Sequence, residues 1–112
     1  MLLDVRKVKI AVAVPIKYLT TVRDAMCDAG CGVIGKYSHC TMSTKIIGTF
    51  MGGDDSNPFV GDRNELIRNH EIKLEALCDV ENVKEALAAI RKVHPYEEVG
   101  IDLYPVILEE DL

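Results

Sequence analysis

The sequence predicts an α+β fold in which strands and helices follow one another in the order β-α-β-β-α-β. Three observations support this prediction. Some segments alternate large apolar residues with small or charged ones, as in strands with one buried face. Others repeat apolar residues at helical spacing, and Gly and Pro residues fall between the segments. The chain has 112 residues, 48% of them hydrophobic, so we expect residues 1–112 to form a single domain.

The first strand and helix are predicted near the N-terminus. Four valine and isoleucine residues recur at every second position before Pro15, which predicts a strand whose core face carries Val8, Ile10, Val12 and Val14. An apolar stripe at helical spacing then predicts a helix, with the members Leu19, Val22, Met26 and Ala29. Gly30 is placed to end this helix in a left-handed conformation.

The middle of the chain is predicted to form a strand or strand pair and a long loop. Residues 37–50 are rich in Thr, Ile and aromatic side chains, and we expect a break near Ser43–Lys45. Alternation within such a strand would turn Cys40 and Met42 toward the core. Turn-forming residues fill positions 52–64, which predicts a loop, yet this loop also carries Phe59.

The second half repeats the pattern of strand, helix and strand. A clean alternation predicts a strand with Ile72, Leu74, Ala76 and Cys78 on its core face. The helical stripe that follows, which Pro95 ends, consists of Val80, Val83, Leu87 and Ile90. A last strand is predicted around Val99, Ile101 and Leu103, and residues 109–112 are expected to form a frayed tail.

This order of elements is that of the ferredoxin-like sandwich, one antiparallel sheet with two helices on one face. The helices can cover only that face of the sheet. The other face would carry Ala11, Ala13, Leu77 and Tyr104 among its charges. Because a half-apolar face is seldom left in water, we expect a second subunit to bury it in a homo-oligomer.

Composition argues against several classes of function. The formal net charge is -5 and no basic run is present, so no nucleic acid is expected as a partner. No apolar stretch approaches the length of a membrane helix, and charge returns too soon after Met1 for a signal peptide. We therefore expect a cytoplasmic protein with no membrane association, whose four cysteines are reduced thiols.

Residues 35–44 form the first segment with candidate chemistry. Polar and aromatic side chains crowd here, and we consider Tyr37, Ser38 and His39 as ligand-binding residues. The alternative is structural, with His39 held by ordinary hydrogen bonds.

Residues 94–99 form the second such segment. The structural alternative is a helix stop, with His94 near the negative end of the helix and solvated glutamates. It leaves Tyr96 and the paired Glu97 and Glu98 unexplained, and we consider Tyr96 a further ligand-binding residue. One imidazole with carboxylates is an incomplete divalent-metal site, which His39, His70 or another subunit would have to complete.

We therefore expect the 37–40 and 94–98 segments to meet at a subunit boundary. Their shared pocket would hold His39, His94 and one of Glu97 and Glu98, and would bind a divalent ion or a small polar ligand. In the long loop, Asn57 and Phe59 are candidate contacts to a ligand or to a protein partner. We expect Phe59 to pack locally or on a neighbouring subunit.

Established catalytic signatures are absent from the sequence. It contains no Walker A loop, no GxGxxG, no HExxH and no GxSxG motif. We therefore assign no catalytic residue and do not expect a self-sufficient enzyme.

Four segments, in order, resemble one protein family: residues 32–40 (GVIGKYSHC), 48–50 (GTF), 57–61 (NPFVG) and 94–99 (HPYEEV). They are similar to the CutA/PII-like insert domain of YqfO-type, Nif-three-like dinuclear-metal proteins. The 94–99 segment also resembles CutA, the divalent-cation tolerance family. In the long members of that family two flanking halves carry the metal ligands, and the resemblance covers only the insert between them, so we do not expect the two-metal chemistry in residues 1–112. The resemblance thus implies a trimer-forming regulatory or ligand-sensing module with no known ligand.

Three hypotheses for the function follow. The first is an oligomeric binding or regulatory module that senses a small ligand, an ion or a partner at subunit interfaces. The second is a divalent-metal-binding protein of CutA character. The third is a hydrolase-like enzyme whose site forms at a subunit interface.

Overall fold

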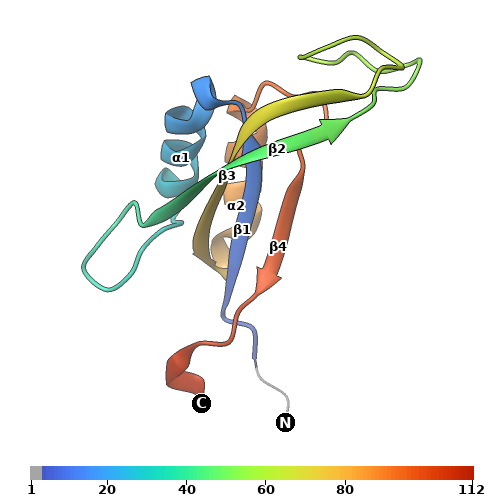
Figure 1. Cartoon of the computed structure of the whole chain (residues 1–112). Coiled ribbons are helices and arrows are strands. Elements are labelled where there is room, and N and C mark those ends of the chain that lie inside the picture. The colour runs from blue at the N-terminus through green and yellow to red at the C-terminus, as the bar shows by residue number, and fades with distance from the viewer. Residues whose placement is uncertain (1–3) are drawn as a thin grey trace.

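The computed structural model describes residues 4–112 (Figure 1). Its elements, in chain order, are β1 (Lys7–Val14), a 3-10 turn (Ile16–Tyr18), α1 (Leu19–Asp28), β2 (Thr41–Phe50), β3 (Ile67–Asp79), a 3-10 turn (Val80–Asn82), α2 (Val83–Val93), β4 (Ile101–Pro105) and a 3-10 turn (Glu109–Asp111).

One antiparallel sheet carries both helices on the same face. Its strands lie in the order β2-β3-β1-β4, and each pairs antiparallel with its neighbours. In Figure 1, α1 and α2 lie side by side behind the sheet, and β4 forms the edge on the right. The predicted order and the predicted two-layer arrangement are confirmed.

The registers of the two hairpin strands make one end of the sheet project. β3 pairs with β1 only from Ile72 onward, where Ile72 lies opposite Val14. Its first five residues, 67–71, pair with β2 alone. The β2–β3 hairpin therefore extends beyond the end of β1 and carries the long loop of residues 51–66 away from the helices (Figure 1).

The core lies between the helices and the sheet, and it confirms the predicted apolar faces. Its buried members are Ile10, Val12, Val14, Val22, Met26, Cys31, Ile72, Leu74, Ala76, Cys78, Ala86 and Ile90. Each large apolar side chain contributes about 1.5–3 kcal/mol when fully buried. All four cysteines are free. Burial raises the pKa of the Cys31 and Cys78 thiols, so these two act as core side chains.

The prediction for residues 37–50 was wrong in two respects. β2 runs without a break from Thr41 to Phe50, and the residues before it form a loop. Thr41 lies opposite the core residue Ala76, so its neighbour Met42 points away from the helices and is 61% exposed. Positive φ angles at Gly35 and His39 keep the preceding segment out of the strand, which moved the expected alternation by one position.

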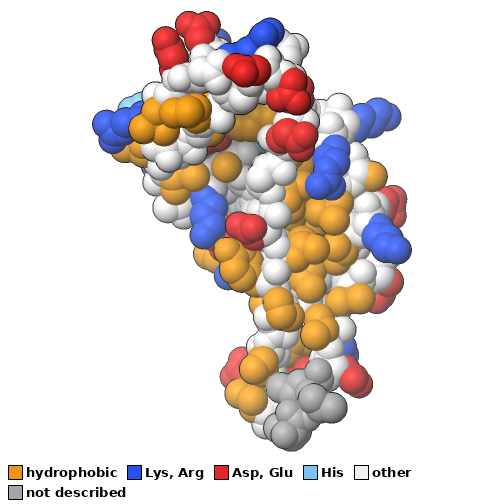
Figure 2. All heavy atoms as spheres, turned by 90° about the vertical axis from the view of Figure 1, so that its right-hand side faces the viewer, with side chains coloured by type: hydrophobic (Ala, Val, Ile, Leu, Met, Phe, Trp, Pro, Cys, Tyr) orange, Lys and Arg blue, Asp and Glu red, His pale blue; other side chains and the backbone are white. Residues whose placement is uncertain are grey.

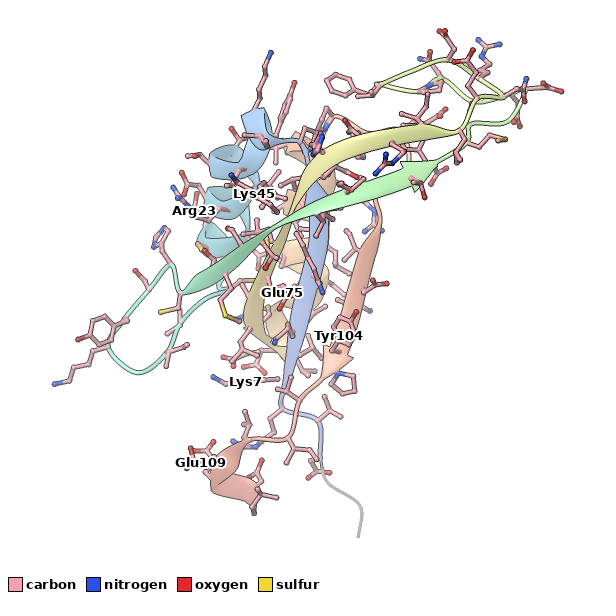
Figure 3. The ribbon with its side chains drawn as sticks, viewed as in Figure 1. Lys7, Arg23, Lys45, Glu75, Tyr104 and Glu109 are labelled. Carbon is pink, nitrogen blue, oxygen red and sulfur yellow. The ribbon has the colours of Figure 1, made fainter. Side chains whose placement is uncertain are left out.

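The face of the sheet that lacks helices is mixed in character. Ala11 is buried, Leu77 is half-buried and Tyr104 is exposed. Glu75 lies among them, 3.4 Å from Lys9 and 3.1 Å from Lys73 (Figure 3). That a second subunit buries this face stays a prediction.

Arg6 contacts the C-terminal tail. The 3-10 turn Glu109–Asp111 places the Glu110 and Asp111 carboxylates 2.9 and 2.7 Å from Arg6 on the surface, and fraying of residues 109–112 stays a prediction. No helix within residues 4–112 is long and apolar enough to cross a bilayer.

Two glycines offer a matched test of the loop that precedes β2. Gly32 has φ +76°, and an added Cβ would lie 3.0 Å from the Cys40 backbone nitrogen, whereas Gly35 has φ +58° and open space around it. Gly35→Ala should therefore cost only the left-handed strain, about 1 kcal/mol. Gly32→Ala should lower the free energy of unfolding further, because the Gly32–Cys40 backbone contact must also shift. Urea unfolding of both variants measures the difference, and equal costs would contradict this account.

Candidate ligand-binding site

A cavity of about 450 Å³ lies where the 51–66 loop meets the segment between α2 and β4, residues 94–100. Side chains from the sheet, the loop and this segment line it, among them Ala13, Phe50, Phe59, Glu71, Tyr96 and Glu97. The predicted ligand contacts Asn57, Phe59 and Tyr96 therefore gather at one end of the sheet.

His94 is a structural anchor of this site. The residue is 7% exposed, its Nε2 lies 2.8 Å from the carbonyl oxygen of Ala13, and its Nδ1 accepts a 3.2 Å hydrogen bond from the backbone N–H of Tyr96. Nδ1 must therefore be unprotonated while Nε2–H donates to Ala13. Burial lowers the pKa of His94, although the Ala13 carbonyl and the Glu71 carboxylate act in the opposite direction. Both imidazole nitrogens of His94 thus have hydrogen-bond partners within the chain.

Tyr96 joins the 94–100 segment to the projecting part of β3. Its hydroxyl donates a 2.8 Å hydrogen bond to Glu71 Oε2 and accepts a 3.2 Å bond from Asn69 Nδ2. Burial, and then the bond to Glu71, raise the pKa of the Tyr96 hydroxyl, so the group stays protonated and remains a donor. The side chain of Glu71 is thereby held as a hydrogen-bond acceptor.

Glu71 is buried, with 6% of its surface exposed, although it lies on the face of the sheet that lacks helices. It is next to the point where β3 leaves β1, and its carboxylate covers Gly48 of β2. A side chain at position 48 would collide with Glu71 Oε1, so the glycine makes room for the carboxylate. Glu71 also lines the cavity.

The 51–66 loop is fastened to the body at the rim of the cavity. The backbone N–H of Asn57 donates a 2.9 Å hydrogen bond to Glu97 Oε2. The Phe59 ring packs between Tyr18 and Tyr96, with both ring centroids 6.1 Å away, and is still 52% exposed. The expectation that Phe59 packs locally is confirmed.

The other predicted site residues lie on a separate loop, residues 33–40. Tyr37 is 75% exposed, and a pair of 3.0 Å backbone hydrogen bonds closes the turn between Ile34 and Tyr37. His39 is exposed with φ +57°, and its Nδ1 lies 3.0 Å from the hydroxyl of Ser38. This loop precedes the end of β2 that pairs with Ala76, whereas His94 bonds to Ala13 near the opposite end of β1.

Within one chain the proposed metal ligands therefore lie apart, some at the cavity end of the sheet and one in the 33–40 loop. Within residues 4–112, no group of three or more His, Cys, Asp or Glu side chains is arranged to hold a metal ion. Glu97 and Glu98 line the cavity, and His39 lies on the other loop. A site shared by His39 and His94 would need a neighbouring subunit and a rearrangement of His94, and it stays a prediction.

Glu71, Asn69 and Tyr18 were missed in the sequence. Glu71 stands between His70 and Ile72 in the alternating strand, on the side opposite the core face, where a charged side chain normally faces solvent. The nearby Gly48 in the predicted partner strand was the available signal, since a glycine within a strand often marks close approach of another group.

Comparison with known proteins confirms the resemblance to one segment of longer proteins. The chain is 46% identical over 98 residues to "GTP cyclohydrolase 1 type 2 homolog" of Bacillus subtilis (strain 168), covering 88% of this chain and 26% of the relative. A protein of the same name from Halalkalibacterium halodurans is 41% identical over 101 residues. The chain thus spans about a quarter of the length of these relatives. No protein-family model matches it.

Solved structures show the same fold. A Bacillus cereus protein related to NIF3 superposes with a TM-score of 0.80 at 34% identity, over 94% of this chain and 27% of that one. CutA1 from Shewanella sp. SIB1 has a TM-score of 0.69 at 14% identity, over 94% and 85% of the two chains. Bacillus subtilis GlnK, solved with ATP, has a TM-score of 0.61 at 10% identity, over 93% and 86%. The ferredoxin-like, CutA/PII-like fold is confirmed.

The lowered pKa of His94 predicts a pH-dependent stability. In the unfolded chain His94 has its ordinary pKa of 6.5, so on acidification the unfolded state binds a proton before the folded state does. The contribution of His94 is complete above pH 6.5. Below this, the free energy of unfolding should fall by up to about 1.4 kcal/mol per pH unit until the folded-state pKa is reached.

Urea unfolding of the wild type and of His94→Gln between pH 7.5 and 5.5 measures this effect (about one pH unit on either side of the unfolded pKa). The glutamine variant should lose part of the dependence, because it keeps an uncharged donor near Ala13. His39→Gln is the control and should behave as the wild type. A dependence that is equal in all three proteins would contradict this role for His94.

Removing the Tyr96 hydroxyl should destabilise the end of the sheet that carries the cavity. Tyr96→Phe leaves the buried Glu71 carboxylate without its donor, which should lower the free energy of unfolding by about 1–3 kcal/mol. The matched variant Tyr37→Phe alters an exposed hydroxyl and should change stability by less than about 0.5 kcal/mol. Denaturant unfolding of both proteins gives the comparison, and a neutral Tyr96→Phe would argue against the hydrogen bond to Glu71.

Proposed function

We propose that this chain is a ligand-binding and regulatory module that acts as a homo-oligomer, with its ligand in the cavity beneath the 51–66 loop. Contact of Asn57 and Phe59 with the cavity rim supports this proposal most directly. Two of the contacts that fasten the loop, Asn57 to Glu97 and Phe59 to Tyr96, use residues that line the cavity. A bound ligand would therefore act on the same side chains that position the loop.

The loop is well suited to report occupancy to a partner. Its rim contacts are few and partly exposed, so their loss would free the loop at small cost in free energy. A ligand with different affinity for the fastened and released arrangements shifts their populations. A protein partner could then distinguish the two states.

The proposed oligomer is a trimer, by analogy with the CutA and PII relatives to which the sequence motifs are similar. Two observations support self-association: one sheet face has no helices, and the edge strands β2 and β4 have unpaired backbone groups on their outer sides. Figure 2 shows apolar side chains gathered over the β4 side of the molecule, with charged side chains around them. A neighbouring subunit could also bring the Tyr37, Ser38 and His39 group toward the cavity.

Divalent-metal binding is the second candidate function. Some structures of similar fold are named for divalent cation tolerance, including the CutA protein of Archaeoglobus fulgidus, and Glu97 and Glu98 line the cavity. Catalysis on GTP, as in the name of the long relatives, has no support from a catalytic group in this chain, which covers 26% of the first relative. We further propose a cytoplasmic location, in keeping with four free cysteines.

A tryptophan reporter tests the proposed site. The chain contains no Trp, so Phe59→Trp places a single fluorophore between Tyr18 and Tyr96. We expect a saturable change in its emission with at least one member of a panel of nucleotides, divalent cations, amines and carboxylates. Val80→Trp is the matched control: Val80 is exposed, lies at the far end of the sheet and does not line the cavity, so its emission should respond less.

Light scattering after size exclusion completes this test and should give a trimer at micromolar concentration. A monomer would remove the support for a subunit-interface site. An absence of any response from Phe59→Trp, at millimolar concentrations of the whole panel, would contradict ligand binding in this cavity.

A further inference from the structure

The charges around the cavity define the class of ligand. Glu71, Glu97 and Glu98 line it, and no Lys, Arg or His is among the lining residues. We infer that the cavity binds an organic cation, an ammonium or guanidinium group attached to an apolar body. This inference rests on the proposed function, because it names the ligand of the same site.

Glu71 is the centre of the argument. Asn69 Nδ2 can only donate, so the Tyr96 hydroxyl accepts from it and directs its own proton to Glu71 Oε2. Oε1, which lies over Gly48, keeps its acceptor capacity. Glu71 as a whole is 6% exposed, and its carboxylate forms no salt bridge within the described residues. Oε1 has no hydrogen-bond partner there and is accessible to solvent.

A largely buried carboxylate without a paired cation is less favourable than a paired one, because it has lost part of its hydration without gaining a compensating charge. Two neighbours accommodate the Glu71 carboxylate: Gly48 leaves room for it, and the Tyr96 hydroxyl donates a hydrogen bond to it. A cationic ligand would supply the missing charge through a hydrogen bond to Oε1. Ionic hydrogen bonds of this kind are stronger than neutral ones.

The remaining walls favour an apolar, partly aromatic ligand body. Phe50, Met51, Pro58 and Phe59 line the cavity together with the Tyr96 ring. Aromatic faces attract ammonium and guanidinium groups and also cover apolar surface. The combination of an aromatic wall with one buried carboxylate is typical of recognition of an amphipathic cation.

Anionic ligands are disfavoured by the same residues. A phosphate or carboxylate in this cavity would lie among three glutamates with no basic side chain in the lining to offset their charge. Figure 2 shows several acidic side chains at the loop end of the molecule, with basic side chains among them, so the bias against anions rests on the cavity lining. The fold likeness to GlnK, which was solved with ATP, therefore does not carry over to the ligand at 10% identity.

A bare divalent ion fits less well than an organic cation. The described residues hold no group of three or more acidic, His or Cys side chains close enough to share an ion. Glu97 Oε2 is already occupied by the Asn57 backbone. A single buried carboxylate, by contrast, is sufficient for one ammonium group.

The test compares three probes of similar size and different charge: phenethylamine, phenethyl alcohol and phenylpropionate. Calorimetric titration of the full chain should show the amine binding most tightly and the carboxylate least. Glu71→Gln, which keeps an acceptor for Tyr96, should weaken amine binding roughly 10- to 100-fold. Glu85→Gln, an exposed acid on α2, is the matched control and should bind as the wild type.

Several results would overturn the inference. Equal binding of the three probes, tighter binding of phenylpropionate, or an unchanged affinity in Glu71→Gln would each do so, and the first and second need no variant. If no amine binds and light scattering shows that Glu71→Gln changes assembly, the cation is a basic side chain of a second copy, and the small-ligand inference fails. A Phe59→Trp response to a different ligand would leave the proposed function intact while ending this inference.

Discussion

The offset pairing of β3 between β1 and β2 is the constraint on which the functional end of the molecule depends. β3 joins β1 only from Ile72 onward, while its first five residues pair with β2 alone. The projecting hairpin leaves the end of β1 uncovered, and the 94–100 segment turns over this end through the bond between His94 and the Ala13 carbonyl. Glu71 lies one residue beyond the last β1 pair, within reach of Tyr96. The cavity is the space enclosed by this geometry.

The folding stability of the chain and the proposed ligand site depend mainly on different residues. The layer between helices and sheet is apolar and supplies the main driving force for folding. The cavity end is instead held by polar contacts: the two bonds of His94, the bonds of the Tyr96 hydroxyl, and the Asn57 contact with Glu97. Such contacts contribute less to folding than burial does and can exchange with ligand or water. A rigid core with an adjustable polar end suits a module whose task is to bind and to signal.

The cavity and the outer face of the sheet belong to one continuous surface. Ala13 lines the cavity and pairs across the sheet with Lys73, whose ammonium contacts Glu75 in the middle of the outer face (Figure 3). A subunit that covered this face would therefore reach the cavity rim, and occupancy could influence assembly. The proposed ligand site and the proposed subunit interface would therefore be coupled, because a change at the cavity rim alters how a second subunit can pack on the outer face.

Local patterns in the sequence determined the fold and part of the site. Alternation and helical periodicity depend on neighbours along the chain, so the strand faces of β1 and β3 and the helix stripes were predicted correctly. The role of Phe59 and Tyr96 in ligand binding stays a prediction, although the two rings pack together. Register and loop geometry depend on distant partners, and these only the tertiary structure decided. The left-handed residues before β2 reversed the expected face of Met42, and the strand offset buried Glu71, which has the sequence environment of a surface residue. His39 and His94 are far apart for a topological reason: α1 leads into β2 at one end of the sheet, whereas α2 leads into β4 at the other.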